Sequence, residues 1–204
     1  MTMTDFSEKL NLKERAEEDI YFARRDRELL EALRRKKADQ QGGRFPRKVV
    51  SGGQSGVDRA SLDAALAAGY EVGGWCPRGR RAEDGPIDGC YPLRETPSPV
   101  YRQRTEWNVR DSDATLILHR GALRGGTELT ARLARRYGRP LLTLDLAQDS
   151  DASIVHRWLA EHRPRILNLA GPRESGVPGI YSEAHAFLLR VLCREAEPAP
   201  RDTG

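Results

Sequence analysis

The sequence predicts an α/β fold, a doubly wound parallel sheet with an N-terminal helical extension. From residue 47 onward, short apolar runs alternate with stretches rich in Ala, Leu and Arg, which is the pattern of repeated βαβ units. The clearest run, residues 114–118, suits a strand buried on both faces of a parallel sheet. Ligands of such sheets bind beyond the carboxyl ends of the strands, so the loops that follow strands carry the candidate site.

The extension comes first in the chain. Residues 7–37 contain no Gly or Pro, and roughly half of them are charged, which favours a long exposed helix. A thin apolar stripe recurs at helical spacing, so this helix either docks on the domain or pairs with a second subunit. A Gln-Gln-Gly-Gly linker ends it at residues 40–43. We therefore expect an extension at 1–43 and a ligand-binding domain at 44–204.

The domain that follows is expected to alternate strands and helices. The first apolar run leads into a glycine-rich turn and then into an Ala/Leu-rich helix, and a Gly-Gly-Thr sequence opens a later helix in the same way. Strands are predicted at 48–51, 71–74, 114–118, 140–144 and 166–169. Helices are predicted at 58–68, 101–110, 126–137, 152–162 and 182–194.

The composition limits the function classes. With 38% hydrophobic and 31% charged residues, the 204-residue chain can bury one core under a highly charged surface. A net charge of +4 suits an anionic small ligand, whereas the dispersed arginines do not predict nucleic-acid binding. The sequence has no apolar run of about 18 residues and no secretory segment, so we expect a cytoplasmic protein without membrane contact. Three cysteines without CxxC spacing, and histidines without ligand spacing, predict neither a disulfide framework nor a tightly bound metal.

The first candidate loop is Ser-Gly-Gly-Gln-Ser-Gly-Val-Asp at residues 51–58. It joins a strand to a helix, where glycines let the backbone approach an anion and the helix start offers N–H groups. Ser51 replaces the first glycine of a dinucleotide fingerprint, no acid stands near Trp75, and the Walker A lysine is absent, so the loop predicts a general phosphate cradle. The structural alternatives are turn formation by Ser55 and a helix N-terminal charge for Asp58. The candidates are Gly52, Gly53, Gln54, Ser55, Gly56 and Asp58.

The second candidate loop, residues 75–86, follows the second predicted strand and is rich in charge. Arg78 and Arg81, with Arg80 between them, are placed to clamp a phosphate through paired donors. Glu83 and Asp84 either accept hydrogen bonds from a ribose or a base, or neutralise the neighbouring arginines.

Two further segments bring polar side chains to the expected site. The helix at 101–110 places Arg104 and Asn108 on one polar face. The loop at 170–179 follows the last predicted strand, so Arg173 and Glu174 either close over a ligand or cap the last helix.

A second anion site is predicted at Gly125-Gly126-Thr127-Glu128. This segment follows the strongest strand and opens a helix, as the first loop does. The alternative is a plain helix start, with Thr127 as the cap and Glu128 in the favourable first turn. Two such loops at neighbouring strand ends favour a shared phosphate-binding site.

Five segments together resemble the molybdenum-cofactor carrier family, in the order 51–66, 73–87, 104–118, 124–134 and 167–181. The resemblance extends over residues 47–192. It implies a cytosolic homo-oligomer, a dimer or a tetramer, that shelters a molybdopterin-type ligand and holds its phosphate on glycine-rich loops. Molybdenum cofactor is then the cargo of the protein.

The family belongs to a Rossmann-like group that includes the cytokinin-activating lonely-guy phosphoribohydrolases. The resemblance places Arg104 at the position of their helix arginine, and Gly126-Thr127 match the Gly-Thr of their PGGxGTxxE signature. Thr130 then occupies the position of the catalytic glutamate. A threonine cannot supply the carboxylate that N-glycosidic cleavage needs, so we expect a binding protein for a phosphorylated heterocycle rather than an enzyme.

Two alternatives stay open. One is a nucleotide N-glycosidic hydrolase or transferase, in which Glu83, Asp84 or Glu128 replaces the missing carboxylate. The other is a nucleotide-sensing module that signals to partners through its N-terminal helix.

Overall fold

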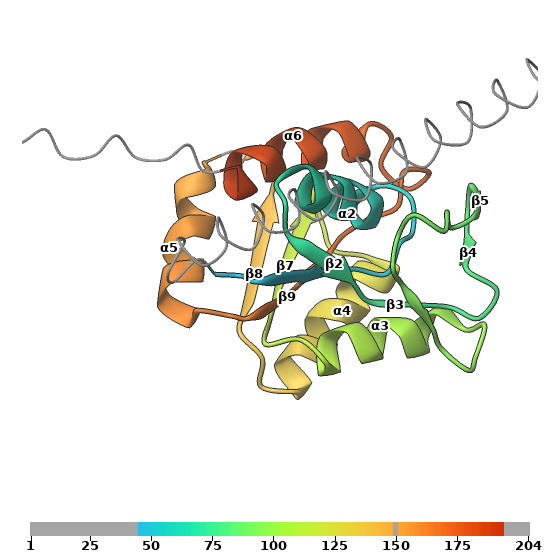
Figure 1. Ribbon diagram of the computed structural model, residues 1–204. Coiled ribbons are helices and arrows are strands. Elements are labelled where there is room, and N and C mark those ends of the chain that lie inside the picture. The colour runs from blue at the N-terminus through green and yellow to red at the C-terminus, as the bar shows by residue number, and fades with distance from the viewer. Residues whose placement is uncertain (1–44, 149–150, 194–204) are drawn as a thin grey trace, which may run out of the picture. The chain divides into compact units, whose positions relative to one another are not determined.

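The computed structural model describes residues 45–148 and 151–193 (Figure 1). The predicted extension at 1–43 lies outside these residues. The predicted α/β class is confirmed, because parallel strands alternate with helices along the described chain. All the strands and helices predicted for this part of the chain are present, with boundaries that differ by at most two residues.

The described residues form a five-stranded parallel sheet in the order β2-β1-β9-β7-β8. β9 is the last of these strands in the chain, yet it lies between β1 and β7. Leu167 of β9 is paired with Val49 on one side and with Ala114 on the other. The loops that follow β1, β9 and β7 are therefore neighbours at the carboxyl edge of the sheet. The strand bounds are β1 Lys48–Val50, β2 Glu71–Gly73, β7 Ala114–His119, β8 Leu141–Asp145 and β9 Ile166–Ala170.

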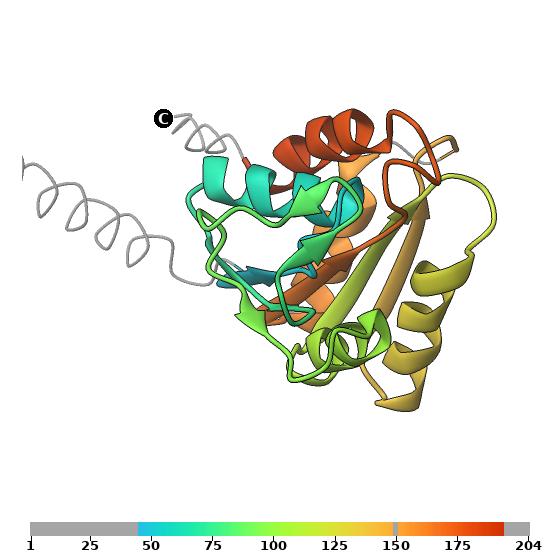
Figure 2. The same ribbon diagram turned by 90° about the vertical axis from the view of Figure 1, so that its right-hand side faces the viewer.

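Helices cover both faces of the sheet (Figures 1 and 2). α2 (Val57–Ala67) and α6 (Ile180–Leu192) pack together on one face, and α5 (Ala152–His162) packs beside α6. α3 (Tyr101–Arg110) and α4 (Gly125–Arg136) cover the other face. None of the described helices is long and apolar enough to cross a membrane.

The main apolar core lies between the sheet and the layer of α2 and α6. Val49, Leu116 and Leu167 of the sheet are fully buried, as is Leu62 of α2. The burial of strand residues on both faces explains why their sequence shows apolar runs rather than alternation. Phe187 of α6 fills the space between the layers.

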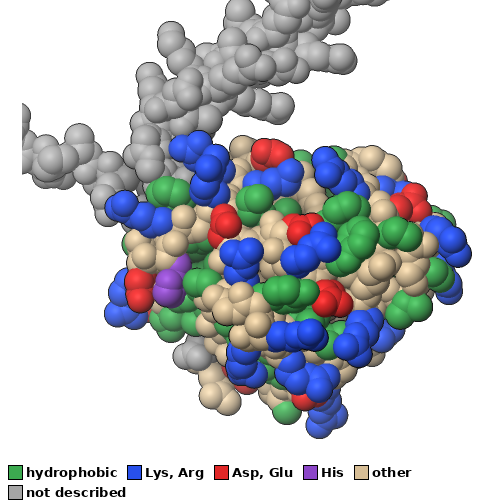
Figure 3. Space-filling view, turned by 90° about the horizontal axis from the view of Figure 1, so that it is seen from below, with side chains coloured by type: hydrophobic (Ala, Val, Ile, Leu, Met, Phe, Trp, Pro, Cys, Tyr) green, Lys and Arg blue, Asp and Glu red, His purple; other side chains and the backbone are tan. Residues whose placement is uncertain are grey.

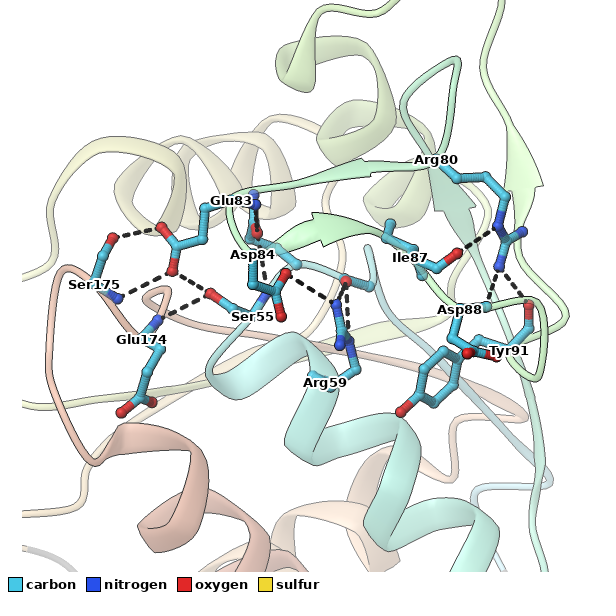
Figure 4. Close-up of polar contacts among 12 residues, drawn as sticks. Ser55, Arg59, Arg80, Glu83, Asp84, Ile87, Asp88, Tyr91, Glu174 and Ser175 are labelled. Atoms are coloured by element: carbon cyan, nitrogen blue, oxygen red, sulfur yellow. Dashed lines mark hydrogen bonds and ion pairs between the residues drawn. The ribbon is translucent and has the colours of Figure 1, made fainter.

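The segment between β2 and α3 adds two small two-stranded sheets. β3 (Trp75–Cys76) pairs with β6 (Arg94–Glu95), and β4 (Arg81–Ala82) pairs with β5 (Gly85–Pro86). Arg80 organises this segment, because its guanidinium donates hydrogen bonds to the carbonyls of Ile87, Asp88 and Tyr91 (Figure 4). It also donates to the carbonyl of Leu93. The arginine therefore holds its own loop, although the sequence had placed it beside a phosphate.

Two leucines of α2, one helical turn apart, test the core. Leu62 is fully buried and Leu66 is 43% exposed. We expect Leu62→Ala to lower the free energy of unfolding by about 2–5 kcal/mol, because it leaves a cavity in the core. Leu66→Ala should cost less than about 1 kcal/mol. Urea unfolding of both variants checks this, and equal losses would contradict the described burial of α2.

Candidate functional site

A cavity of about 640 Å³ lies at the carboxyl edge of the sheet. We call it the main cavity. Its walls come from the loops after β1, β7 and β9 and from the first turns of α3 and α4, which matches the place where ligands bind in such sheets. The residues used below are Gln54, Asp58, Tyr101, Arg102, Arg104, Arg120, Leu123, Arg124, Gly125, Gly126, Thr127, Leu129, Arg173 and Val177.

The N-terminus of α4 opens into the main cavity. Gly125 and Gly126 are exposed, and a Cβ atom added to either would meet no atom within 4 Å. The N–H groups of Thr127 and Glu128 both donate to the carbonyl of Arg124, at 3.2 and 3.4 Å. The first N–H groups of a helix have no acceptor within the helix, and the positive end of the helix dipole lies there. This helix start is therefore suited to an anion.

The N-terminus of α2 differs, because the chain itself occupies it. Val57 N–H donates to the carbonyl of Pro172 at 3.2 Å, and Arg59 N–H donates to the carbonyl of Gln54 at 3.0 Å. The carboxylate of Asp58, only 3% exposed, sits in the first turn. Both helices have an acid in their first turn, Asp58 in α2 and Glu128 in α4, but only Asp58 is buried, and α4 is the more open of the two helix starts.

A buried ion pair joins α2 to α3. Arg104 Nη1 donates to Asp58 Oδ2 at 2.7 Å, with side-chain exposures of 15% and 5%. Gly52 is needed for this contact, because a Cβ atom there would lie 1.5 Å from Nη1. Among the described residues, none accepts a hydrogen bond from the buried Nε atom of Arg104.

The main cavity is rich in positive charge. Arg102, Arg104, Arg120, Arg124 and Arg173 line it, and Asp58 is the only acid among the described residues that do so. Three of these arginines are in ion pairs, Arg104 with Asp58, Arg120 with Glu183 and Arg173 with Glu83. Within the described residues, Arg102 and Arg124 supply the positive charge that is not paired, and this charge favours an anionic ligand. Lys and Arg side chains are also numerous on the face formed by α3 and α4 (Figure 3).

A further cavity of about 650 Å³, the side cavity, is lined by residues from α2 and α6 and from the loops around them. Asp63 accepts hydrogen bonds from the hydroxyls of Tyr91 and Tyr181, at 2.6 and 2.8 Å. Burial, together with the hydrogen bond to Asp63, raises the pKa of Tyr181 to about 12 and also raises the pKa of Tyr91. The side cavity carries the carboxylates that the main cavity lacks: Asp63, Glu83, Asp84 and Glu174.

The wall between the cavities consists of two loops in direct contact. A Cβ atom on Gly56 would lie 2.5 Å from the carbonyl oxygen of Pro172 and 2.7 Å from the nitrogen of Glu174, so glycine permits this approach. Gln54 faces the main cavity and Ser55 faces the side cavity. Neighbouring residues of one loop therefore belong to different cavities.

The structure distributes the predicted site residues over three places. The main cavity receives Gln54, Asp58, Arg104, Gly125, Gly126, Thr127 and Arg173. The side cavity receives Ser55, Gly56, Glu83, Asp84 and Glu174. Gly52, Gly53, Arg78, Arg81, Asn108 and Glu128 are not among the lining residues of either.

Some predicted residues have structural contacts. Asn108 accepts a hydrogen bond from the backbone N–H of Trp75 at 2.8 Å and donates one to its carbonyl at 2.9 Å, which ties α3 to β3. Glu174 accepts hydrogen bonds from the N–H groups of Gly179 and Tyr181, so it caps α6. The capping role was the alternative that the sequence had left open for Glu174.

The sequence did not single out several lining residues. Arg120 and Arg124 both precede the predicted Gly-Gly-Thr loop, and their positive charge beside that loop was the signal that could have identified them. Asp63, Tyr91 and Tyr181 belong to no local motif, because they are far apart in the chain and meet only in the fold. In the part of the chain that the structure describes, no group of three or more His, Cys, Asp or Glu side chains is placed to hold a metal ion.

Comparisons with known proteins give two matches. The family model described as "Circularly permutated YpsA SLOG family" matches residues 49–192, a segment that contains every lining residue of both cavities. A solved structure from Syntrophus aciditrophicus SB, named "Putative molybdenum carrier protein", is 43% identical, with a TM-score of 0.70. The match covers 73% of this chain and 96% of that one. A comparison with curated proteins gives no match.

The buried ion pair gives a test of the site's framework. Asp58→Asn leaves the buried guanidinium of Arg104 without its counter-charge, and we expect the free energy of unfolding to fall by about 3 kcal/mol. Asp84→Asn removes a half-exposed carboxylate that lies 3.4 Å from Arg59, and this should cost less than about 1 kcal/mol. Urea unfolding at pH 7 compares the two, and a loss for Asp58→Asn no larger than that for Asp84→Asn would contradict the role of the pair.

Proposed function

The chain belongs to the circularly permutated YpsA SLOG family, and from that membership we propose that it is a carrier for a phosphorylated heterocyclic ligand, bound in the main cavity. The observation that carries the proposal is the asymmetry of charge in this cavity. Arginines line it together with an open helix N-terminus, whereas the one acid among its described lining residues is neutralised by Arg104.

The start of α4 is the proposed position of the phosphate. Gly125 and Gly126 line the cavity at the first turn of α4, and Arg124 precedes them directly. An arginine beside such a helix start adds charge-assisted hydrogen bonds to the same anion.

The rest of the main cavity suits the heterocyclic ring system of the proposed ligand. Its volume of about 640 Å³ falls within the range of about 300–1,000 Å³ that is typical of small-molecule sites. Leu123, Leu129 and Val177 supply apolar contacts, and Tyr101 adds an aromatic ring at the edge. Apolar walls with a few charged groups bind a ring and orient its phosphate.

Molybdenum cofactor is the first candidate for the ligand, because the solved relative is named a molybdenum carrier. The molybdenum would enter as part of this cargo, and we propose no resident metal. We also propose that the protein acts as a cytoplasmic homo-oligomer, a dimer or a tetramer, which light scattering tests.

Cleavage of the ligand's N-glycosidic bond is less well supported. Such cleavage requires a carboxylate near the sugar carbon that becomes positively charged. Glu83 and Asp84 line the side cavity, and Glu128 lines neither. Thr130, which the resemblance places at the catalytic glutamate of the phosphoribohydrolases, donates its hydroxyl hydrogen to the carbonyl of Gly126 at 2.9 Å. These placements favour holding the ligand over breaking it.

Mass spectrometry of the ligand that co-purifies with the full chain tests the proposal directly. Calorimetric titration with molybdenum cofactor and with nucleoside monophosphates should show micromolar binding of at least one. A folded protein that binds neither would overturn the proposal. Release of free base from the nucleotides would show the hydrolase instead.

Substitution of Gly126 tests the position of the phosphate. The site has open space for a side chain, so Gly126→Asp should fold normally, and its carboxylate should stabilise the helix start. The same charge should repel a phosphate and weaken binding at least about tenfold, or about 1.4 kcal/mol. Gly126→Asn is the uncharged control of equal size and should bind more tightly than Gly126→Asp. Equal affinities would place the phosphate elsewhere.

A further inference from the structure

The carboxylate of Glu83 connects three segments that are distant in the sequence (Figure 4). It projects from the turn between β4 and β5. Ser55, from the loop after β1, donates its hydroxyl hydrogen to Oε1. Ser175, from the loop after β9, donates its backbone N–H to Oε1 at 3.0 Å and its hydroxyl hydrogen to Oε2. One side chain thus receives donors from both loops of the wall.

The two loops are also linked to each other at this point. The hydroxyl of Ser55, which donates to Glu83, accepts a hydrogen bond from the N–H of Glu174 at 3.2 Å. The two hydrogen bonds therefore form a chain, in which the Glu174 N–H donates to the Ser55 hydroxyl and the Ser55 hydroxyl donates to Glu83. An acceptor at the end of this chain of hydrogen bonds is needed to orient the Ser55 hydroxyl.

Ionised Glu83 matches this set of donors. A carboxylate only accepts hydrogen bonds, and it has room for several donors. Burial alone would raise the pKa of Glu83, but the hydrogen bonds from Ser175 and Ser55 and the charge of Arg173 outweigh it, so the pKa is lowered. The side chain is 19% exposed and stays charged at neutral pH.

Two residues of the main cavity depend on the same segment. Arg173 Nη1 lies 3.6 Å from Glu83 Oε2. Gln54 Oε1 accepts hydrogen bonds from the backbone N–H groups of Glu83 and Ser55, at 2.8 and 3.0 Å. Both Arg173 and Gln54 line the main cavity, whereas Glu83 itself lines the side cavity.

We propose that Glu83 is a positioning residue, which fixes the two-loop wall and thereby holds Arg173 and Gln54 in place for the ligand without contacting it. This inference rests on the proposed function of the main cavity. It replaces two expectations from the sequence, that Glu83 accepts a ribose hydroxyl or takes over from the missing catalytic glutamate. Its oxygens already serve Ser55, Ser175 and Arg173.

Glu83→Gln tests the proposal, with Glu71→Gln as the control. The glutamine amide has the size of the glutamate side chain, but its NH₂ group is a donor and would face the donor groups of Ser55 and Ser175. Glu71→Gln removes the same charge and one ion pair, with Lys48, at the opposite edge of the sheet. In hydrogen–deuterium exchange, Glu83→Gln should speed the exchange of the Glu174 and Ser175 amides and of residues 52–56 together. Glu71→Gln should leave all of them unchanged.

Binding gives the second readout, with a nucleoside monophosphate and molybdenum cofactor as the probes. Glu83→Gln should weaken binding about tenfold, which is about 1.4 kcal/mol. If Glu83 acts through Arg173, the double variant Glu83→Gln/Arg173→Ala should bind little more weakly than Arg173→Ala alone. Full additivity of the two losses, or an unchanged affinity in Glu83→Gln, would overturn the positioning role.

The exchange experiment and the binding experiment test this inference and the proposed function separately. If the wild-type protein binds neither probe, the proposed function fails, while the exchange experiment still decides whether Glu83 fixes the wall. Ser175→Ala serves if Glu83→Gln does not fold, because it removes one hydroxyl donor and keeps the backbone. Exchange that changes only in residues 81–86 would overturn the proposal in either variant.

Discussion

The pairing of β9 with both β1 and β7 is the interaction on which the site depends. It places the loop after β9 between the loops after β1 and β7, so that three segments from distant parts of the chain share one edge. Leu167 and Leu169, two residues apart in β9, point to the same face of the sheet and secure this position by their burial in the main apolar core. Without that register, neither the arginines of the main cavity nor the carboxylates of the side cavity would be brought together.

The wall of two loops also separates charges of opposite sign. Arginines collect on the side of α3 and α4, and carboxylates collect on the side of α2 and α6. The separation keeps the carboxylates of Glu83, Asp84 and Glu174 out of the main cavity, where they would compete with an anionic ligand for hydrogen-bond donors. Two residues depart from this separation. Asp58 lies in the main cavity, where Arg104 neutralises it, and Arg59 lines the side cavity, 3.4 Å from Asp84.

The strands and helices were predictable because their signals are local. The apolar run at 114–118 and the glycine turns at 52–56 and 125–126 identify their elements without knowledge of the rest of the chain. The order of the strands is not a local property, and the sequence alone did not show that β9 lies at the centre. The loops that carry Gln54 and Gly126 were correctly expected at one edge, but their strands are not neighbours as expected, because β9 lies between β1 and β7. The separation of Glu83 from the main cavity also required the fold. Arg120 and Arg124 were overlooked because single arginines next to a loop have many possible roles.

The central place of β9 has a consequence for the folding of this domain. Residues 166–170 must pair with residues 48–50, more than a hundred positions earlier, before the sheet becomes continuous. Contacts between such distant segments slow folding, because the entropy of closing the intervening loop is lost first. While β9 is still inside the ribosome, the nascent chain contains β1 and β7 but lacks the strand that joins them. The main cavity, whose walls come from the loops after β1, β7 and β9, is therefore completed only after residues 166–170 have paired, late in the synthesis of the domain.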